Sequence, residues 1–117
     1  MELKRVVVTG LGALTPVGNN VAETWENLVK GISGAGPITH FDASKFKTHF
    51  ACEVKNFNGT DYIDRKELRK MDLYTQYAIA AAKEAVEDSG MDLEKEDLNR
   101  IGVIYGVGIG LSLIHIS

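Results

Sequence analysis

Residues 4–10, Lys-Arg-Val-Val-Val-Thr-Gly, decide the fold class, because three adjacent β-branched side chains run into a glycine turn. A short apolar run without alternation is typical of a strand that is buried on both faces, as strands inside α/β sheets are. Residues 101–105, Ile-Gly-Val-Ile-Tyr, have the same character and lead into a glycine-rich turn. The two runs predict two enclosed strands, and hence an α/β fold.

The first helix is expected directly after residue 20. Asn20 and Glu23 have the spacing of a capping box, and apolar residues then recur at helical intervals. Residues 31–49 are rich in glycine and poor in periodic apolar positions. We therefore predict an ordered loop there, anchored in the core by Phe41 and Phe46.

Two further helices are predicted, over residues 65–70 and 73–89. Asp64 opens a second capping box, and Asp72 can cap the longer helix. The centre of the longer helix is apolar and alanine-rich on every side, so it should be enclosed by elements that approach it closely. Gly90 is expected to end this helix in the left-handed conformation, with a short polar helix or turn after it.

The chain contains one cysteine and three histidines. Residues 50–57 alternate loosely between apolar and polar side chains, so Cys52 is expected to be a small buried residue of a half-buried strand. The histidines show no metal-ligand spacing with it, and no nucleophile, base and orienting group occur together. We therefore predict no metal site and no catalytic residue. The single cysteine and the lack of a leader segment favour the cytoplasm.

Composition excludes several classes of protein. The chain has 117 residues, is 44% hydrophobic and has a net charge of −3, which is ordinary for a globular domain and unlike a protein that coats nucleic acid. Residues 101–117 lack charged side chains, but they are too few and too rich in glycine for a membrane span. Neither nucleic acid nor a membrane is therefore expected as a partner.

Positive charge is concentrated at one place. Four of the thirteen basic residues, Arg65, Lys66, Arg69 and Lys70, share one sector of the predicted helix over residues 65–70. On an acidic chain this cluster could steer an acidic or phosphate-bearing partner. The alternative is a solvated face whose charges form ordinary ion pairs with little effect.

Gly10 and Gly12 follow the first predicted strand, as in a dinucleotide-binding turn. The third glycine position holds Thr15, the next helix starts too late to direct its amides at a phosphate, and the expected acidic residue is absent. An NAD(P)-dependent oxidoreductase thus remains an alternative, although the dinucleotide-binding motif is incomplete.

The order of these motifs resembles that of the β-ketoacyl-acyl-carrier-protein synthases (3-oxoacyl-ACP synthases), members of the thiolase-like family. The resemblance covers residues 1–110 and depends on the following segments: 5–12, 15–18, Trp25, 41–42, 65–72, 76–77, 88–90 and 101–110. It implies the N-terminal part of a thiolase-like α/β/α/β/α layered fold, here incomplete. Relatives are usually homodimers and need no cofactor.

The resemblance also implies a reaction. In this family a cysteine carries the acyl chain, and two histidines assist decarboxylative Claisen condensation with malonyl-acyl-carrier protein in fatty acid biosynthesis. All three residues are expected beyond residue 110, so this chain should be inactive alone. Lys66, Arg69 and Lys70 match positions that dock the carrier protein with its phosphopantetheine-linked acyl and malonyl groups. Ile109 matches a position that lines the acyl pocket.

The resemblance ends near residue 110. Residues 111–117, Leu-Ser-Leu-Ile-His-Ile-Ser, are similar to the translation of a sequencing adapter, so we expect an artefactual tail after a partial synthase domain over residues 1–110. Two interpretations of that domain remain open. It is a fragment of an active condensing enzyme, or it is a non-catalytic relative that only docks the carrier protein. Residues outside this chain would distinguish them.

Overall fold

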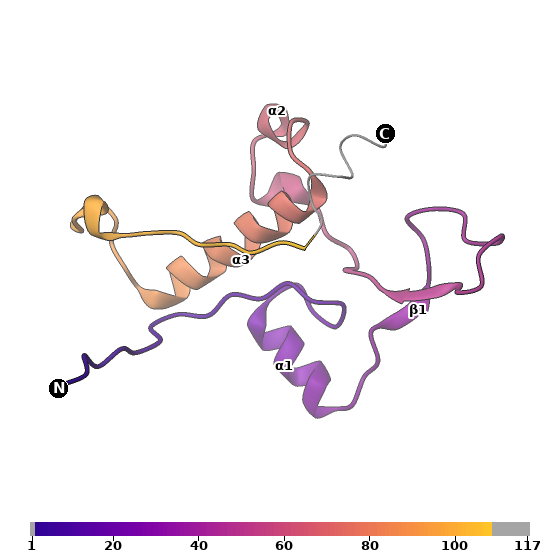
Figure 1. Cartoon of the computed structure of the whole chain (residues 1–117), viewed down its shortest axis with the longest axis horizontal. Coiled ribbons are helices and arrows are strands. Elements are labelled where there is room, and N and C mark those ends of the chain that lie inside the picture. Colours follow the sequence, from indigo (N-terminus) through magenta and orange to yellow (C-terminus); the bar gives the residue numbers. More distant parts are fainter. Residues whose placement is uncertain (1, 109–117) are drawn as a thin grey trace. The chain divides into compact units, whose positions relative to one another are not determined.

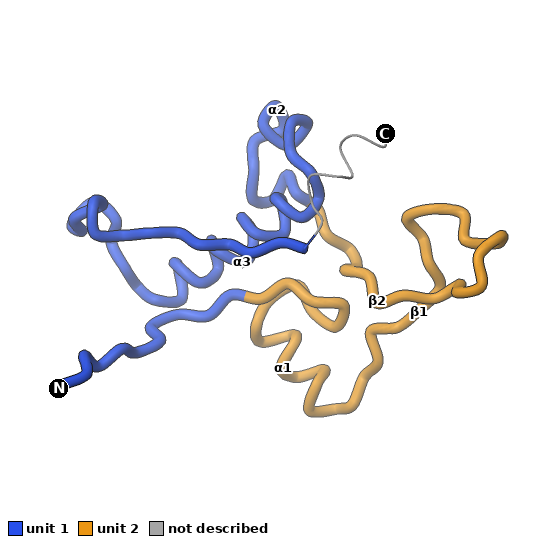
Figure 2. Tube along the Cα trace, in the orientation of Figure 1, with its two compact units in different colours: residues 1–12, 59–117 blue, residues 13–58 orange. Residues whose placement is uncertain are grey.

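The computed structural model describes residues 2–108, so the expectations for Ile109 and residues 111–117 lie outside the described residues. The chain forms two compact units, one of residues 13–58 and one that combines residues 1–12 with residues 59–117 (Figure 2).

The unit of residues 13–58 contains helix α1 (Val21–Val29) and the strands β1 (Ala35–Pro37) and β2 (Phe50–Cys52) (Figure 1). The predicted capping residue is confirmed, since Asn20 Oδ1 accepts a 2.8 Å hydrogen bond from the Glu23 amide. Before α1, Thr15 and Gly18 close a tight turn with reciprocal backbone bonds of 2.8 and 3.2 Å.

The predicted loop over residues 31–49 is only partly confirmed, because it contains strand β1. β1 pairs antiparallel with β2, with Gly36 opposite Ala51. Sequence pattern missed β1 because Ala-Gly-Pro has low strand propensity, yet proline is tolerated at the end of a strand without a second neighbour.

Three predicted burials in this unit are wrong. Phe41 and Phe46 are 56% and 60% exposed, and they stack edge to face on each other with ring centroids 5.7 Å apart instead of anchoring in a core. Ala43, between them in sequence, is the buried residue. Cys52 is exposed as well, since the half-buried side chain of β2 belongs to Ala51. A two-stranded ribbon covers too little area to bury alternate residues of one strand.

The second unit is built on helix α3 (Leu73–Ser89), which has the predicted bounds. Gly90 ends α3 in the left-handed conformation with φ 69° and ψ 11°, as predicted. The short helix α2 (Arg65–Leu68) precedes α3, and the single turns η1 (Gly59–Asp61) and η2 (Leu98–Arg100) complete the unit. Residues 93–96 form the expected polar turn. Asp64 and Asp72 occupy the two N-cap positions, but neither side chain makes a capping hydrogen bond.

The two predicted enclosed strands are not formed within the described residues. Residues 4–10 and 101–105 have no ladder partner there, and Val6 and Ile104 are 89% and 99% exposed. A strand needs a neighbour for its backbone N–H and C=O groups, and the described residues provide none. The centre of α3 is correspondingly only half enclosed, with Ala80 buried and Ala82 exposed.

Within residues 2–108, no helix is long and apolar enough to cross a membrane.

Candidate functional site

The strongest charged feature of the described residues surrounds helix α2. We call Arg65, Lys66, Arg69 and Lys70 the basic surface; all four residues are exposed. Lys70 Nζ lies 3.8 Å from Glu67 Oε1, a contact between side chains that are 74% and 57% exposed and hence weakly coupled. Among residues 2–108, no carboxylate lies within ion-pair distance of the other three basic side chains. Most of the positive charge of the basic surface is therefore not neutralised by carboxylates of the described residues.

Packing against η1 and α3 holds the basic surface in place. Leu68, the half-buried residue of α2, lies against Gly59 of η1, where an added Cβ would come within 2.5 Å of Leu68 Cδ1 and 2.7 Å of Gln76 Oε1. Gln76 of α3 donates from Nε2 to the Met71 carbonyl oxygen at 3.3 Å. One apolar contact of Leu68 and one hydrogen bond to Met71 thus tie α2 and the turn after it to η1 and α3.

The glycines of the dinucleotide-binding alternative have another use in the structure. A Cβ at Gly10 would overlap the Ala85 carbonyl oxygen, and one at Gly12 would overlap that of Ala81, so both glycines allow the chain to lie directly on α3. The amide of Leu11 donates to Asp88 Oδ2 at 2.9 Å. An amide that is bonded to a carboxylate beside a helix is not available to a pyrophosphate, which argues against a nucleotide site here. The alanines of α3 permit close approach, as predicted.

The cysteine and the histidines do not form a catalytic site in the described residues. His49 Nε2 hydrogen-bonds the Phe46 carbonyl oxygen at 2.5 Å, and His40 Nε2 lies 3.9 Å from Glu53 Oε1. No cluster of metal-ligating side chains occurs among residues 2–108.

Among residues 2–108, two carboxylates have a clearly lowered pKa, and both belong to the unit of residues 13–58. The pKa of Glu53 is lowered mainly by the hydrogen bond from Thr39 Oγ1, at 2.7 Å, with smaller contributions from the Thr39 and His40 amides. Partial burial of the carboxylate opposes this shift. The pKa of Asp42 is lowered by hydrogen bonds from the amide and hydroxyl of Ser44. The hydrogen bonds that cause these shifts stabilise the connection between β1 and β2. A lowered pKa keeps both carboxyl groups ionised near neutral pH, so neither can donate a proton there.

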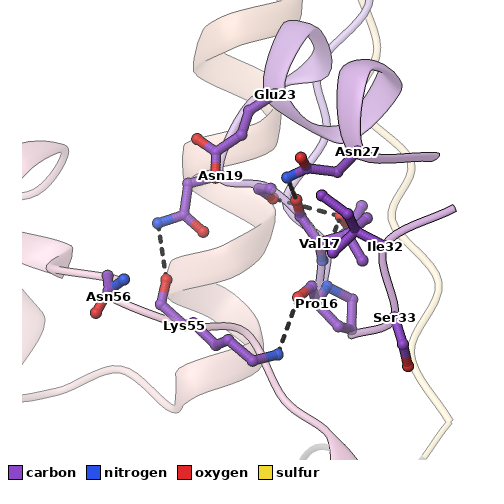
Figure 3. A pocket seen from close by; sticks show the side chains of 11 residues that line it. Pro16, Val17, Asn19, Glu23, Asn27, Ile32, Ser33, Lys55 and Asn56 are labelled. Carbon is purple, nitrogen blue, oxygen red and sulfur yellow. Dashed lines mark hydrogen bonds between the residues drawn. The ribbon is translucent and has the colours of Figure 1, made fainter. Parts of the chain in front are cut away.

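A pocket of about 310 Å³ lies between the 15–18 turn, the start of α1 and Lys55 (Figure 3). Polar side chains line it, among them Asn19, Glu23 and Asn27. Asn19 Nδ2 donates to the Lys55 carbonyl oxygen at 2.9 Å, and Asn27 Nδ2 donates to that of Val17 at 2.5 Å. Sequence reasoning missed this pocket, because its residues are scattered over four segments; the Thr-Pro-Val-Gly turn was the only local signal.

Comparisons with known proteins identify relatives of the whole chain. The model of the family described as beta-ketoacyl synthase, N-terminal domain, matches residues 3–115. A 3-oxoacyl-[acyl-carrier-protein] synthase 2 of Staphylococcus aureus is 54% identical over 92% of this chain and 26% of its own length. The protein of the same name from Vibrio harveyi is 51% identical over 98% of this chain and 28% of its own length. The chain thus spans about a quarter of the length of these relatives.

Two solved structures are also similar. The ishigamide ketosynthase/chain length factor superposes with a TM-score of 0.70 and 41% identity, over 75% of this chain and 22% of its own. A type II polyketide ketosynthase in complex with its acyl-carrier protein gives a TM-score of 0.59 and 27% identity, over 80% of this chain and 24% of its own. These likenesses confirm a partial α/β fold of the thiolase-like kind.

Proposed function

Because the chain belongs to the beta-ketoacyl synthase N-terminal domain family, we propose that it is part of a condensing enzyme of fatty acid biosynthesis. The observation that carries this proposal is 54% identity to a 3-oxoacyl-[acyl-carrier-protein] synthase over 92% of the chain. The reaction is decarboxylative condensation of an enzyme-bound acyl group with malonyl-acyl-carrier protein. The active enzyme is a cytoplasmic homodimer whose cysteine and two histidines lie outside residues 1–110.

The role proposed for this part of the enzyme is to receive the carrier protein on the basic surface. Lys66, Arg69 and Lys70 would contact acidic side chains of the carrier and its phosphopantetheine phosphate. Exposure of all three residues and the single weak ion pair support this role, since unpaired positive charge accelerates encounter with an acidic partner. Ile109 is proposed to line the acyl pocket.

A non-catalytic carrier-docking relative is the second candidate, and the same exposed basic surface supports it equally. The two candidates differ in residues outside this chain: a cysteine and two histidines at the family's catalytic positions support the condensing enzyme, and their replacement supports docking alone.

Charge reversal tests the docking role in the whole protein that carries this chain. Lys66→Glu together with Arg69→Glu should raise the KM for the acyl-carrier protein about tenfold or more, because attraction becomes repulsion. The dependence of this KM on ionic strength should become weaker, while kcat at saturating carrier changes little.

Lys45→Glu with Lys47→Glu is the matched control, since both lysines are exposed and lie in the other unit. This control introduces the same change in net charge and should leave the KM within about twofold. Equal kinetics for the two double variants would remove the basic surface from the docking site, whereas absence of condensation in the unaltered protein would refute the enzymatic proposal alone.

A further inference from the structure

Lys55 has an unusual environment within the unit of residues 13–58. Its ammonium group donates to three backbone carbonyl oxygens, those of Pro16 at 3.0 Å, Gly34 at 2.7 Å and Glu53 at 3.0 Å. A lysine ammonium has three N–H donors, so these bonds use all of them. Among the described residues, no carboxylate lies within ion-pair distance of Lys55. Lys55 is an exposed residue, so within the described part of the chain its charge is met by carbonyl dipoles on one side and by solvent on the other.

The three carbonyls come from separate parts of the unit. Pro16 lies in the tight turn before α1, Gly34 directly precedes β1, and Glu53 directly follows β2. Asn19 adds a reciprocal contact, since its Nδ2 donates to the Lys55 carbonyl oxygen at 2.9 Å (Figure 3). The Lys55 residue thus connects the 15–18 turn to both strands at the open end of the hairpin, and it forms one wall of the pocket.

Three converging carbonyls around a single positive charge are the arrangement that proteins use for monovalent cations. Hydrogen bonds from a charged donor are about twice as strong as neutral ones, so the ammonium is a tighter link than three separate neutral contacts would be. The pocket wall therefore depends on a cation that the chain supplies itself.

We propose that the Lys55 ammonium acts as a tethered cation in a carbonyl site formed by Pro16, Gly34 and Glu53, and that removing it leaves a site for free ammonium or a primary alkylammonium ion. The site orders the 15–18 turn and the pocket beside it. It does not depend on the function proposed above, because its residues take no part in the basic surface.

Hydrogen exchange in the whole protein that carries this chain tests the proposal. Thr15 and Gly18 are the amides to follow, since each donates to the other's carbonyl across the turn that contains Pro16. In Lys55→Met, exchange at these two amides should be about tenfold faster than in the unaltered protein. Addition of ammonium or methylammonium chloride should restore most of the protection.

The controls separate a specific site from a general salt effect. Tetramethylammonium at the same ionic strength has the charge but no N–H donor, so it should not restore protection. Lys30→Met removes a lysine whose ammonium group forms an exposed ion pair with Glu26 at 2.7 Å, and it should leave Thr15 and Gly18 unchanged. Unaltered exchange in Lys55→Met, or equal restoration by tetramethylammonium, would overturn the proposal.

A second measurement on the unaltered protein covers the case in which Lys55→Met does not fold. An amine reacts with an acylating reagent through its nitrogen lone pair, which becomes accessible at Lys55 only after the carbonyl bonds are broken. All three of Lys45, Lys47 and Lys55 are exposed, so the difference expected between them comes from the three carbonyl bonds of Lys55. At limiting reagent, peptide mass spectrometry should therefore show at least about fivefold slower labelling of Lys55 than of Lys45 and Lys47. Equal labelling of the three lysines would contradict the carbonyl site.

Discussion

Gly12 shows how a single residue positions a neighbouring helix. The structure leaves no room for a side chain here, because an added Cβ would overlap the Ala81 carbonyl oxygen of α3. Gly12→Ala should therefore push residues 10–12 away from α3 and weaken the bond between the Leu11 amide and Asp88. Overpacking of this kind costs about 1–3 kcal/mol of the free energy of unfolding, which denaturant titration of the whole protein can measure.

Gly36→Ala is the matched control for Gly12→Ala. Gly36 lies in β1 of the other unit, and a Cβ there would meet nothing within 4 Å among the described residues. Its free energy of unfolding should change by less than about 0.5 kcal/mol. Equal losses in the two variants would show that the cost does not come from contact with α3, since the entropy effect of replacing glycine by alanine is itself stabilising.

Sequence analysis considered Gly10 and Gly12 only as part of a dinucleotide-binding turn, and the structure shows that they pack on α3 instead. The distinction depends on Asp88, which is 77 positions from Leu11. Local pattern carries no information about a partner at that distance. The same limit applies to Lys55, whose carbonyl partners Pro16 and Gly34 are 39 and 21 positions away.

At the scale of elements, Glu53 connects strand β2 with the segment that follows β1. Its carboxylate accepts hydrogen bonds from the Thr39 hydroxyl and amide, and these bonds lower its pKa. A carboxyl group whose pKa is lower in the folded state stabilises the fold above its unfolded pKa, which is about 4.3 for glutamate. That stability is lost as the pH falls through the folded pKa.

This linkage predicts the pH at which the hairpin connection loosens. The Thr39 amide resonance should titrate with a midpoint below the ordinary glutamate value, because protonation of Glu53 removes the acceptor that this amide uses. In Glu53→Gln the amide resonance should be displaced at neutral pH and should not titrate in this range. A midpoint at or above about 4.3 in the unaltered protein would contradict the linkage.

Helices were easier to predict than strands, for a physical reason. The bounds of α3 follow from local periodicity and from Gly90, whose left-handed conformation ends the helix without help from other elements. The strands expected over residues 4–10 and 101–105 need hydrogen-bonding neighbours, which the described residues do not supply. β1 shows the converse, because pairing with β2 makes a strand of Ala-Gly-Pro despite its low propensity.

The candidate site also has one part that the sequence predicts and one part that it does not. The basic surface was predictable as a cluster, because its four charges lie within six residues, although α2 ends at Leu68 and Arg69 and Lys70 form the turn after it. What holds it, the packing of Leu68 on Gly59 and the bond from Gln76 to Met71, involves no recognisable motif. Charge is visible in a sequence, whereas the contacts that orient it depend on the fold.

At the scale of the whole molecule, exposed apolar surface predicts how the 117-residue chain behaves alone. Val6, Val8, Val103 and Ile104 are between 79% and 99% exposed, and Ala43 and Ala80 are the buried hydrophobic residues of the described part. Proteins that are soluble as monomers rarely leave so much apolar surface open. The relatives have about four times the length of this chain, which leaves ample sequence to cover these segments.

The isolated chain should therefore lack a cooperative thermal transition, bind a hydrophobic dye and associate as its concentration rises. Replacing Val6 and Val8 with threonine should reduce this association without producing a cooperative transition, because threonine keeps the β-branched shape but lowers the gain from apolar contact. The matched control is the pair Leu28→Thr and Val29→Thr on α1, which removes similar apolar area from the other unit. A sharp calorimetric melt of a monomer, with equal calorimetric and van't Hoff enthalpies, would show instead that these segments find their partners within the chain itself.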